Sequence, residues 1–228
     1  MPQTDVSLFL QPRAPLPETD RALLAAAVAR VCDVDLAAVT IEQRCSRCGG
    51  AHGRPRVLRP RGAFVSLSRA GDAVVVAVSL AGPIGVDIES LAAVARAGFD
   101  GVAFNADERF ALQRMPSAER DRTRARLWTT KEALLKLSGQ GLTVDPQELT
   151  VGLGEAGASA GAGASAGAEA SGSGSASAGT GAEASALLSW PTATLDLSRV
   201  HVVGFDAGPG LVGTLAVLGP RPPSLSVL

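Results

Sequence analysis

Two lysines close together in the chain are the first residues whose type suggests a chemical role. Lys131 and Lys136 are the only lysines in the sequence, because every other basic residue among its 21 Lys and Arg residues is arginine. They flank Glu132 in the stretch WTTKEALLKL, residues 128–137. A compact ammonium group on a flexible stem suits a phosphate as a point charge. The alternative is an ordinary helix with a stabilising Glu132–Lys136 pair at i, i+4.

A second, acidic motif favours the phosphate interpretation. Asp87 and Glu89 lie two residues apart in GVDIE, at the end of a run rich in β-branched residues. In an extended strand such residues share a face, about 6.6 Å apart along the chain. Two carboxylates on one face repel each other unless a cation lies between them, and Mg²⁺ takes oxygen ligands and phosphate. Glu132 is a natural third ligand, whereas the alternative is a strand end with two solvent-exposed carboxylates.

A loop at residues 42–62 offers further groups for phosphate binding. Gly53-Arg54-Pro55 in this loop predicts a rigid turn whose backbone can approach a ligand closely. The alternative is a solvated basic loop. The arginines crowding it are Arg44, Arg47, Arg54 and Arg56, and Arg69 follows in the next hairpin.

The same loop carries two cysteines and a histidine. Cys45, Cys48 and His52 are arranged like half of a zinc site, and a closed site would need Cys32 as its fourth ligand. No second Cys or His pair accompanies them. We therefore expect small loop residues beside a ligand pocket rather than a zinc site, and three cysteines give no disulfide framework.

The elements that must position these residues follow one order in the first half. The pattern predicts a helix over residues 20–32, then VDLAAVTI at residues 34–41, which turns into a short strand. After the loop, a hairpin is expected over residues 63–80, with its turn at 70–72. A third strand is expected over residues 83–88.

The second half repeats this order. A helix is expected over residues 118–137, VDPQELTV follows at residues 144–151, and a hairpin over residues 199–219 turns at 207–210. The two Val-Asp segments share their spacing and their β-branched ends. We therefore expect a mixed α/β (α+β) fold made of two similar halves related by a pseudo-twofold axis, residues 1–97 and 98–228.

A low-complexity tract interrupts the second half. Residues 152–186 are almost entirely Ala, Gly, Ser and Glu, so they cannot bury enough apolar surface to offset their ordering entropy. We expect a disordered insertion there. Such an insertion is tolerated because the entropy of loop closure grows slowly with loop length.

Composition limits the kinds of partner. The chain has 228 residues and a net charge of −1, which gives no global field that would attract nucleic acid or an anionic membrane. The N-terminus lacks the features of a signal peptide, and no apolar run reaches the roughly 18 residues of a membrane helix. We expect a soluble, cytoplasmic and monomeric protein without nucleic-acid or membrane partners.

Together the motifs resemble those of the Sfp-type 4′-phosphopantetheinyl transferases. GVDIE followed by W-x-x-K-E-A-x-x-K resembles the paired signatures of that family. HGRP resembles its G-K-P motif, and VSLSRAG resembles its F-N-L-S-H-S-G segment. The resemblance covers residues 20–151 and 190–218. It implies a pseudo-twofold α/β pair with the coenzyme A site in the cleft between the halves.

The resemblance also implies a reaction. A serine of an apo acyl or peptidyl carrier protein would attack the β-phosphorus of coenzyme A, and 3′,5′-ADP would leave. Asp87, Glu89 and Glu132 would bind Mg²⁺, which bridges to the pyrophosphate. Lys131 and Lys136 would hold phosphates, and Lys136 is placed to neutralise the leaving group.

Further residues acquire roles in the same way. The resemblance assigns the 3′-phosphate and pyrophosphate end of coenzyme A to Arg54, Pro55, Ser68 and Arg69. Glu108, in FNADERF, matches a carboxylate proposed in some members to deprotonate the attacking serine. Its alternative is a helix capping box with Asn105. We expect the indole of Trp128 to anchor the hydrophobic core.

The sequence departs from the family pattern at a residue that the resemblance assigns to the phosphate end of coenzyme A. Arg69 stands where the family usually has histidine, which keeps a donor but changes reach and cannot titrate. The segment before Asp20 is short, so we expect an early helix to be absent. The alternative function is a catalytically inactive module that binds a carrier protein or coenzyme A.

Overall fold

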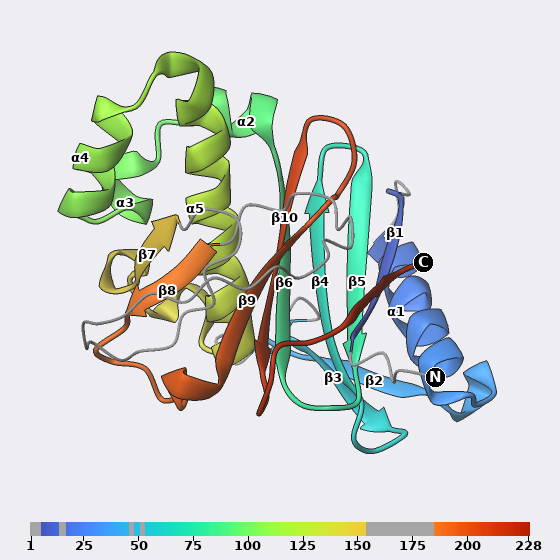
Figure 1. Ribbon diagram of the computed structural model, residues 1–228. Coiled ribbons are helices and arrows are strands. Elements are labelled where there is room, and N and C mark those ends of the chain that lie inside the picture. Colours follow the sequence, from blue (N-terminus) through green and yellow to red (C-terminus); the bar gives the residue numbers. More distant parts are fainter. Residues whose placement is uncertain (1–5, 14–16, 46–47, 51–52, 154–184) are drawn as a thin grey trace, which may run out of the picture.

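The computed structural model (Figure 1) describes residues 6–13, 17–45, 48–50, 53–153 and 185–228. The first half contains β1 (Val6–Pro12), α1 (Pro17–Cys32), the 3₁₀ turn η1 (Leu36–Ala38), β2 (Thr40–Gln43), β3 (Pro55–Arg59), β4 (Phe64–Ala70) and β5 (Ala73–Ser79). The second half begins with β6 (Ile84–Ser90), α2 (Leu91–Arg96), α3 (Asp100–Ala103), α4 (Ala106–Arg114) and the long α5 (Ser117–Ser138). It continues with η2 (Gly141–Thr143), η3 (Pro146–Glu148), β7 (Thr150–Leu153), β8 (Ser185–Ser189), η4 (Leu197–Arg199), β9 (Val200–Phe205), β10 (Leu211–Leu218) and β11 (Leu225–Val227).

The sheet order confirms the predicted internal repeat. One sheet has the order β11-β1-β5-β4 and another has β6-β10-β9, so β1-β5-β4 in the first half matches β6-β10-β9 in the second. Each Val-Asp segment forms a 3₁₀ turn followed by a strand, η1-β2 and η3-β7. These strands pair in two small antiparallel sheets, β2 with β3 and β7 with β8.

The repeat locates the boundary between the halves. β6 pairs antiparallel with β10 as β1 pairs with β5, so β6 is the first strand of the second unit. On this pattern we propose that the second repeated unit begins at Ile84, whereas the division at residue 97 stays a prediction from the sequence. The second half also contributes a strand to the sheet of the first half, because β11 at the end of the chain pairs parallel with β1.

The two larger sheets and the two long helices form four layers. In β5, Val76 and Val78 pack in a cluster with α1, whereas Val75 and Ala77 pack in a cluster shared with β6 and β10. Because neighbouring residues of a strand point to opposite faces, one sheet lies between α1 and the other sheet. Figure 1 shows α1 and α5 on opposite sides of the sheets.

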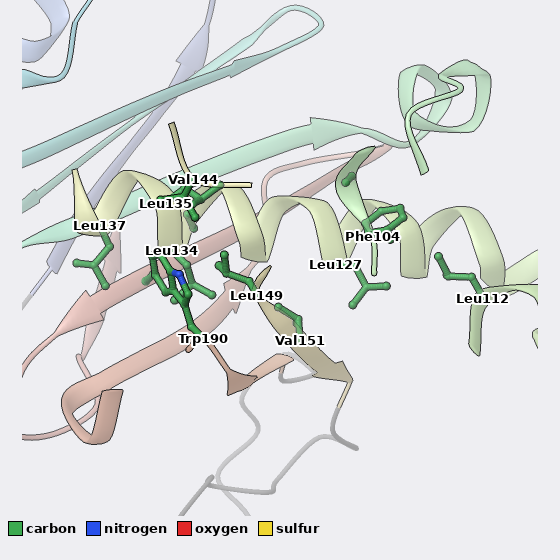
Figure 2. Packing of buried hydrophobic residues seen from close by; sticks show 13 residues of the cluster. Phe104, Leu112, Leu127, Leu134, Leu135, Leu137, Val144, Leu149, Val151 and Trp190 are labelled. Carbon is green, nitrogen blue, oxygen red and sulfur yellow. The ribbon is translucent and has the colours of Figure 1, made fainter. Parts of the chain in front are cut away.

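The largest core cluster surrounds α5. Leu127, Leu134 and Leu137 of α5 pack against Phe104 and Trp190. The side chains of Phe104 and Trp190 are fully or nearly fully buried. Figure 2 shows these side chains gathered along one face of the helix. A helix that carries the site motif is thus held by apolar side chains from both sides of the low-complexity tract.

Several elements differ from the sequence-based prediction. The loop expected over residues 42–62 contains β3, and the N-terminal segment forms β1. The two ends of the low-complexity tract lie in β7 and β8, where Gly152 is opposite Ala186. The remainder of the predicted disordered insertion, residues 154–184, lies outside the described residues. No helix of the described segments is long and apolar enough to cross a membrane.

A glycine sets the distance between β6 and α5. A Cβ atom at Gly85 would lie 2.0 Å from the carbonyl oxygen of Ala133 and 2.5 Å from the amide nitrogen of Leu137. The strand therefore packs directly on the backbone of the helix. Only glycine leaves room for this approach, since backbone atoms cannot move aside as a flexible side chain can.

We predict that Gly85→Ala destabilises the protein through this contact. The added methyl group must push α5 away from β6, and such overpacking costs about 1–3 kcal/mol or more. Urea unfolding followed by circular dichroism measures the loss. Gly98→Ala is the control, because a Cβ atom at Gly98 would meet nothing within 4 Å. Equal unfolding midpoints for Gly85→Ala and the unchanged protein would contradict the close strand–helix contact.

We also predict that residues 154–184 can be replaced by a two-residue Asn-Gly turn. Leu153 and Ser185 are paired at the end of the β7–β8 ladder, so a short hairpin turn can join them directly. A shorter connection lowers the entropic cost of closing the loop on folding. The free energy of unfolding should therefore rise by roughly 2 kcal/mol at most. A lower thermal midpoint in the shortened chain would show that the segment contributes to folding.

Candidate active site

Asp87 lies at the centre of the candidate site and is almost completely buried. Its side chain extends from the same face of β6 as Gly85, which is the face that packs on α5. Its Oδ1 atom accepts hydrogen bonds from Ser68 Oγ and from Lys136 Nζ, both at 2.6 Å. Its Oδ2 atom is buried and has no hydrogen-bond partner within the described residues. One oxygen of a buried carboxylate is therefore left without any compensating donor.

Glu89 and Glu132 lie near this carboxylate. Burial, together with the negative charge of Asp87, raises the pKa of Glu89 to about 7. Burial also raises the pKa of Glu132, again with a contribution from the charge of Asp87. The pKa of Asp87 itself is raised by burial, against the opposing effect of Lys136. Three carboxylates thus share a partly buried region in which their ionised forms destabilise one another.

These properties fit a divalent cation. A hard cation such as Mg²⁺ takes carboxylate oxygens, and Asp87 Oδ2 is a buried oxygen that such an ion would satisfy. Among the described residues, however, no group of three His, Cys, Asp or Glu side chains is already arranged to hold a metal ion. Glu89 and Glu132 would have to turn toward Asp87 to complete the set, so the metal ligands stay a prediction.

α5 presents its site residues in a single stripe. Trp128, Glu132 and Lys136 follow one another at intervals of four residues, so they lie on the same face of the helix. Trp128 Nε1 donates a hydrogen bond of 3.1 Å to Glu89 Oε1, and its ring packs against Phe99. Trp128 therefore contributes to the core, as predicted, and also holds a site carboxylate, which the sequence did not indicate.

Lys136 contacts both the strand and the site. Besides Asp87, its Nζ donates to the carbonyl oxygen of Val86 at 3.2 Å, and its side chain is 29% exposed. An ammonium group has three N–H donors, and the described residues accept two of them. One donor can therefore reach a ligand from solvent.

Lys131 has a different environment from the one predicted. Its side chain is fully buried, and its Nζ donates to Glu108 Oε2 at 2.5 Å and to the carbonyl oxygens of Ala103 and Pro146. All three N–H groups are thus used inside the protein. Burial lowers the pKa of Lys131, and the Glu108 carboxylate opposes this effect. In this arrangement Lys131 has no donor left for a phosphate.

Glu108 belongs to the same buried cluster. Its Oε2 also accepts from the backbone N–H of Asn105, whose side chain accepts in turn from the N–H of Glu108, and these two bonds form a capping box at the start of α4. Its Oε1 accepts from the N–H of Val151. Both oxygens are occupied and the residue is 5% exposed, so Glu108 would have to release a partner to contact a serine.

Ser68 and Arg69 point to opposite faces of β4, as neighbouring residues of a strand do. Ser68 reaches Asp87, whereas the Arg69 guanidinium forms an ion pair of 2.6 Å with Asp20 on α1. Arg69 therefore braces α1 against its sheet in this structure. Its departure from the histidine of the family pattern does not alter the surroundings of Asp87.

The predicted basic loop forms a pocket of about 420 Å³. Arg54, which precedes β3 at Pro55, donates through Nη2 to the carbonyl oxygen of Leu137 at 3.3 Å, so the pocket adjoins the C-terminal end of α5. The lining has a net positive charge. His52, which the sequence predicted beside a ligand pocket, lies outside the described residues. The lining residues are Glu42, Arg44, Cys45, Gly49, Arg54 and Arg56.

We predict that Lys131→Met destabilises the protein strongly and leaves phosphate binding intact. Removing the ammonium group leaves the Glu108 carboxylate buried without a counter-ion, which costs about 3–5 kcal/mol. The double variant Glu108→Gln/Lys131→Met should recover part of that loss, as a double-mutant cycle by urea unfolding would show. If a folded Lys131 variant loses affinity for pyrophosphate while its stability is unchanged, Lys131 is a ligand residue instead.

Comparison with known sequences finds similarity in the segment that forms this site. A family model described as the 4′-phosphopantetheinyl transferase superfamily matches residues 83–174, which contain β6, α5 and all three site carboxylates. The 4′-phosphopantetheinyl transferase psf-1 of Bacillus pumilus is 33% identical over 137 residues. The match covers 60% of this chain and 58% of that relative. The segment that holds Asp87, Glu89, Glu132 and Lys136 is therefore similar to the 4′-phosphopantetheinyl transferase superfamily.

Proposed function

We propose that the protein transfers the 4′-phosphopantetheine arm of coenzyme A to a serine of an apo acyl or peptidyl carrier protein. The observation that carries this proposal is the buried Asp87 carboxylate, with one oxygen bound to Lys136 and the other without a donor. Such a group suits a site where a cation and an anionic ligand meet. The family match over residues 83–174 supports the same reaction.

In this proposal each site residue has a separate role in phosphoryl transfer. The serine hydroxyl oxygen forms a bond to the β-phosphorus of coenzyme A, the pyrophosphate P–O bond breaks, and 3′,5′-ADP departs with the bonding electrons. Mg²⁺, held by Asp87, Glu89 and Glu132, would supply positive charge beside the pyrophosphate. The third donor of Lys136 would stabilise charge on the leaving group.

The serine proton needs an acceptor at the site. Glu108 does not meet this need, because both of its oxygens accept hydrogen bonds inside the protein. Glu132 accepts no hydrogen bond from the described residues and is only partly buried, so it is the carboxylate best placed to contact the reacting hydroxyl. Its position on the same helical stripe as Lys136 would bring proton acceptor and leaving-group cation to one ligand.

The arginine pocket would receive the nucleotide end of coenzyme A. Arg44, Arg54 and Arg56 line it, and guanidinium groups bind phosphates through two parallel N–H bonds. The hydrogen bond from Arg54 to the end of α5 links this pocket to the helix that carries Lys136. A coenzyme A molecule would therefore have its 3′-phosphate in the pocket and its pyrophosphate near Asp87.

We predict that the protein adds one phosphopantetheine group to an apo carrier protein when coenzyme A and Mg²⁺ are present. Intact-mass spectrometry of the carrier measures the transfer. Asp87→Asn and Glu132→Gln should each lower the rate about 10²–10³-fold, as expected when a group that stabilises transition-state charge is lost. A chelator should abolish the transfer.

Glu119→Gln is the matched control for these variants. Glu119 is an exposed carboxylate in the first turn of the same helix, so its substitution should leave the rate unchanged. Binding of coenzyme A without any mass gain on several acyl and peptidyl carriers would contradict the transferase proposal. That result would favour the alternative of a module that binds coenzyme A without catalysis.

A further inference from the structure

Among the described residues, Ser68 is the neutral side chain that hydrogen-bonds to the Asp87 carboxylate. It lies in β4, is 7% exposed, and donates its hydroxyl hydrogen to Asp87 Oδ1 at 2.6 Å. β4 runs beside β6, and Ser66 on the same strand accepts a hydrogen bond of 3.0 Å from the backbone N–H of Val86. The two serines therefore cover the edge of β6, but only Ser68 reaches a site side chain.

The contact of Ser68 defines the orientation of the Asp87 carboxylate. The terminal torsion of an aspartate is broad, so a carboxylate with one partner can rotate and exchange its two oxygens. Ser68 and Lys136 both donate to Oδ1, from a strand and from a helix respectively. With Oδ1 held on two sides, Oδ2 points consistently toward the region without donors.

Ser68 and Lys136 are not equivalent in this respect. The ammonium group of Lys136 sits on a flexible stem and is partly exposed, so it can turn toward an anionic ligand. The hydroxyl of Ser68 sits on a short side chain in a buried strand and has no comparable freedom. When Lys136 turns to the ligand, Ser68 is the side chain that keeps Oδ1 occupied, beside the backbone N–H of Ile88 that also interacts with the Asp87 carboxylate.

We propose that Ser68 is a positioning residue that fixes Asp87 so that Oδ2 is the atom offered to the divalent cation. This proposal rests on the proposed function, in which Asp87 is a metal ligand. It gives Ser68 a different partner from the coenzyme A phosphate that the family resemblance implies. Groups that orient a metal ligand typically change metal affinity about 10–100-fold when they are removed.

The test measures binding of Mn²⁺, as a paramagnetic replacement for Mg²⁺, by electron paramagnetic resonance with coenzyme A at saturation. Ser68→Ala should weaken Mn²⁺ binding about 10–100-fold, whereas Ser68→Thr, which keeps the hydroxyl group, should restore most of the affinity. Ser66→Ala is the matched control, because it removes a hydrogen bond of similar burial that does not involve the carboxylate. It should leave Mn²⁺ affinity unchanged.

Kinetics gives an independent readout. In Ser68→Ala the Mg²⁺ concentration for half-maximal activity should rise, while kcat at saturating Mg²⁺ stays close to that of the unchanged protein. Loss of affinity for coenzyme A, with unchanged affinity for its analogue lacking the 3′-phosphate and unchanged Mn²⁺ binding, would overturn the proposal and make Ser68 a phosphate contact.

A further variant separates this proposal from the proposed function. Asp87→Asn should abolish tight Mn²⁺ binding if Asp87 is a ligand. If the unchanged protein and Asp87→Asn bind Mn²⁺ equally, or if neither binds it, the metal site itself is wrong and both proposals fail. If Asp87→Asn loses binding while Ser68→Ala and Ser66→Ala both retain it, only the role of Ser68 is overturned.

Discussion

The contact between the backbones of β6 and α5 at Gly85 is the constraint on which the rest of the site depends. Asp87 and Glu89 follow Gly85 on the same face of the strand, and Trp128, Glu132 and Lys136 form one stripe on the helix. At an ordinary strand–helix spacing of about 10 Å, side chains rather than backbones would fill the gap. Here the missing side chain lets Lys136 reach both Val86 and Asp87.

Around this contact, the other elements hold α5 in place. The buried pair of Lys131 and Glu108 ties the helix to the start of α4 and to η3, through the carbonyl oxygen of Pro146. Burying two charges gains little stability over apolar packing, but leaving one of them unpaired is costly. The pair therefore favours one position of the helix over others. The same helix carries Glu132 on its neighbouring face, so its placement affects the site directly.

The sequence predicted the helices and strands whose apolar residues recur with a clear period, and it predicted which site residues those elements carry. Asp87 and Lys136 meet, and Glu89 and Glu132 lie near them, because strand and helix periodicity place each pair on one face. Lys131 was grouped with Lys136, yet residues five apart on a helix point about 140° away from each other. Strand alternation likewise separates Arg69 from Ser68. In both cases the residue type suggested phosphate, and the geometry of the element directed the side chain elsewhere.

Other features could not be predicted because their cause is tertiary. A three-residue strand such as β11 has no pattern of its own and forms only because β1 offers an unpaired edge. The hydrogen bond from Ser68 to Asp87 depends on how two sheets meet, which no local spacing reveals. For Glu108 the capping-box spacing with Asn105 correctly predicted the local structure, whereas the match to a catalytic carboxylate stays a prediction.

The repeat of the fold also bears on binding stoichiometry. β1, the counterpart of β6, reads VSLFLQP and carries no carboxylate, and α1 has the apolar run LLAAAVA where α5 has its charged motif. β1 therefore offers no side-chain ligand for a cation, whereas β6 carries two of the proposed ligands. On the proposed metal site, a chain built from two such units should bind a single cation. β1 is free to change its sequence as long as it keeps its apolar volume and the edges that pair with β5 and β11.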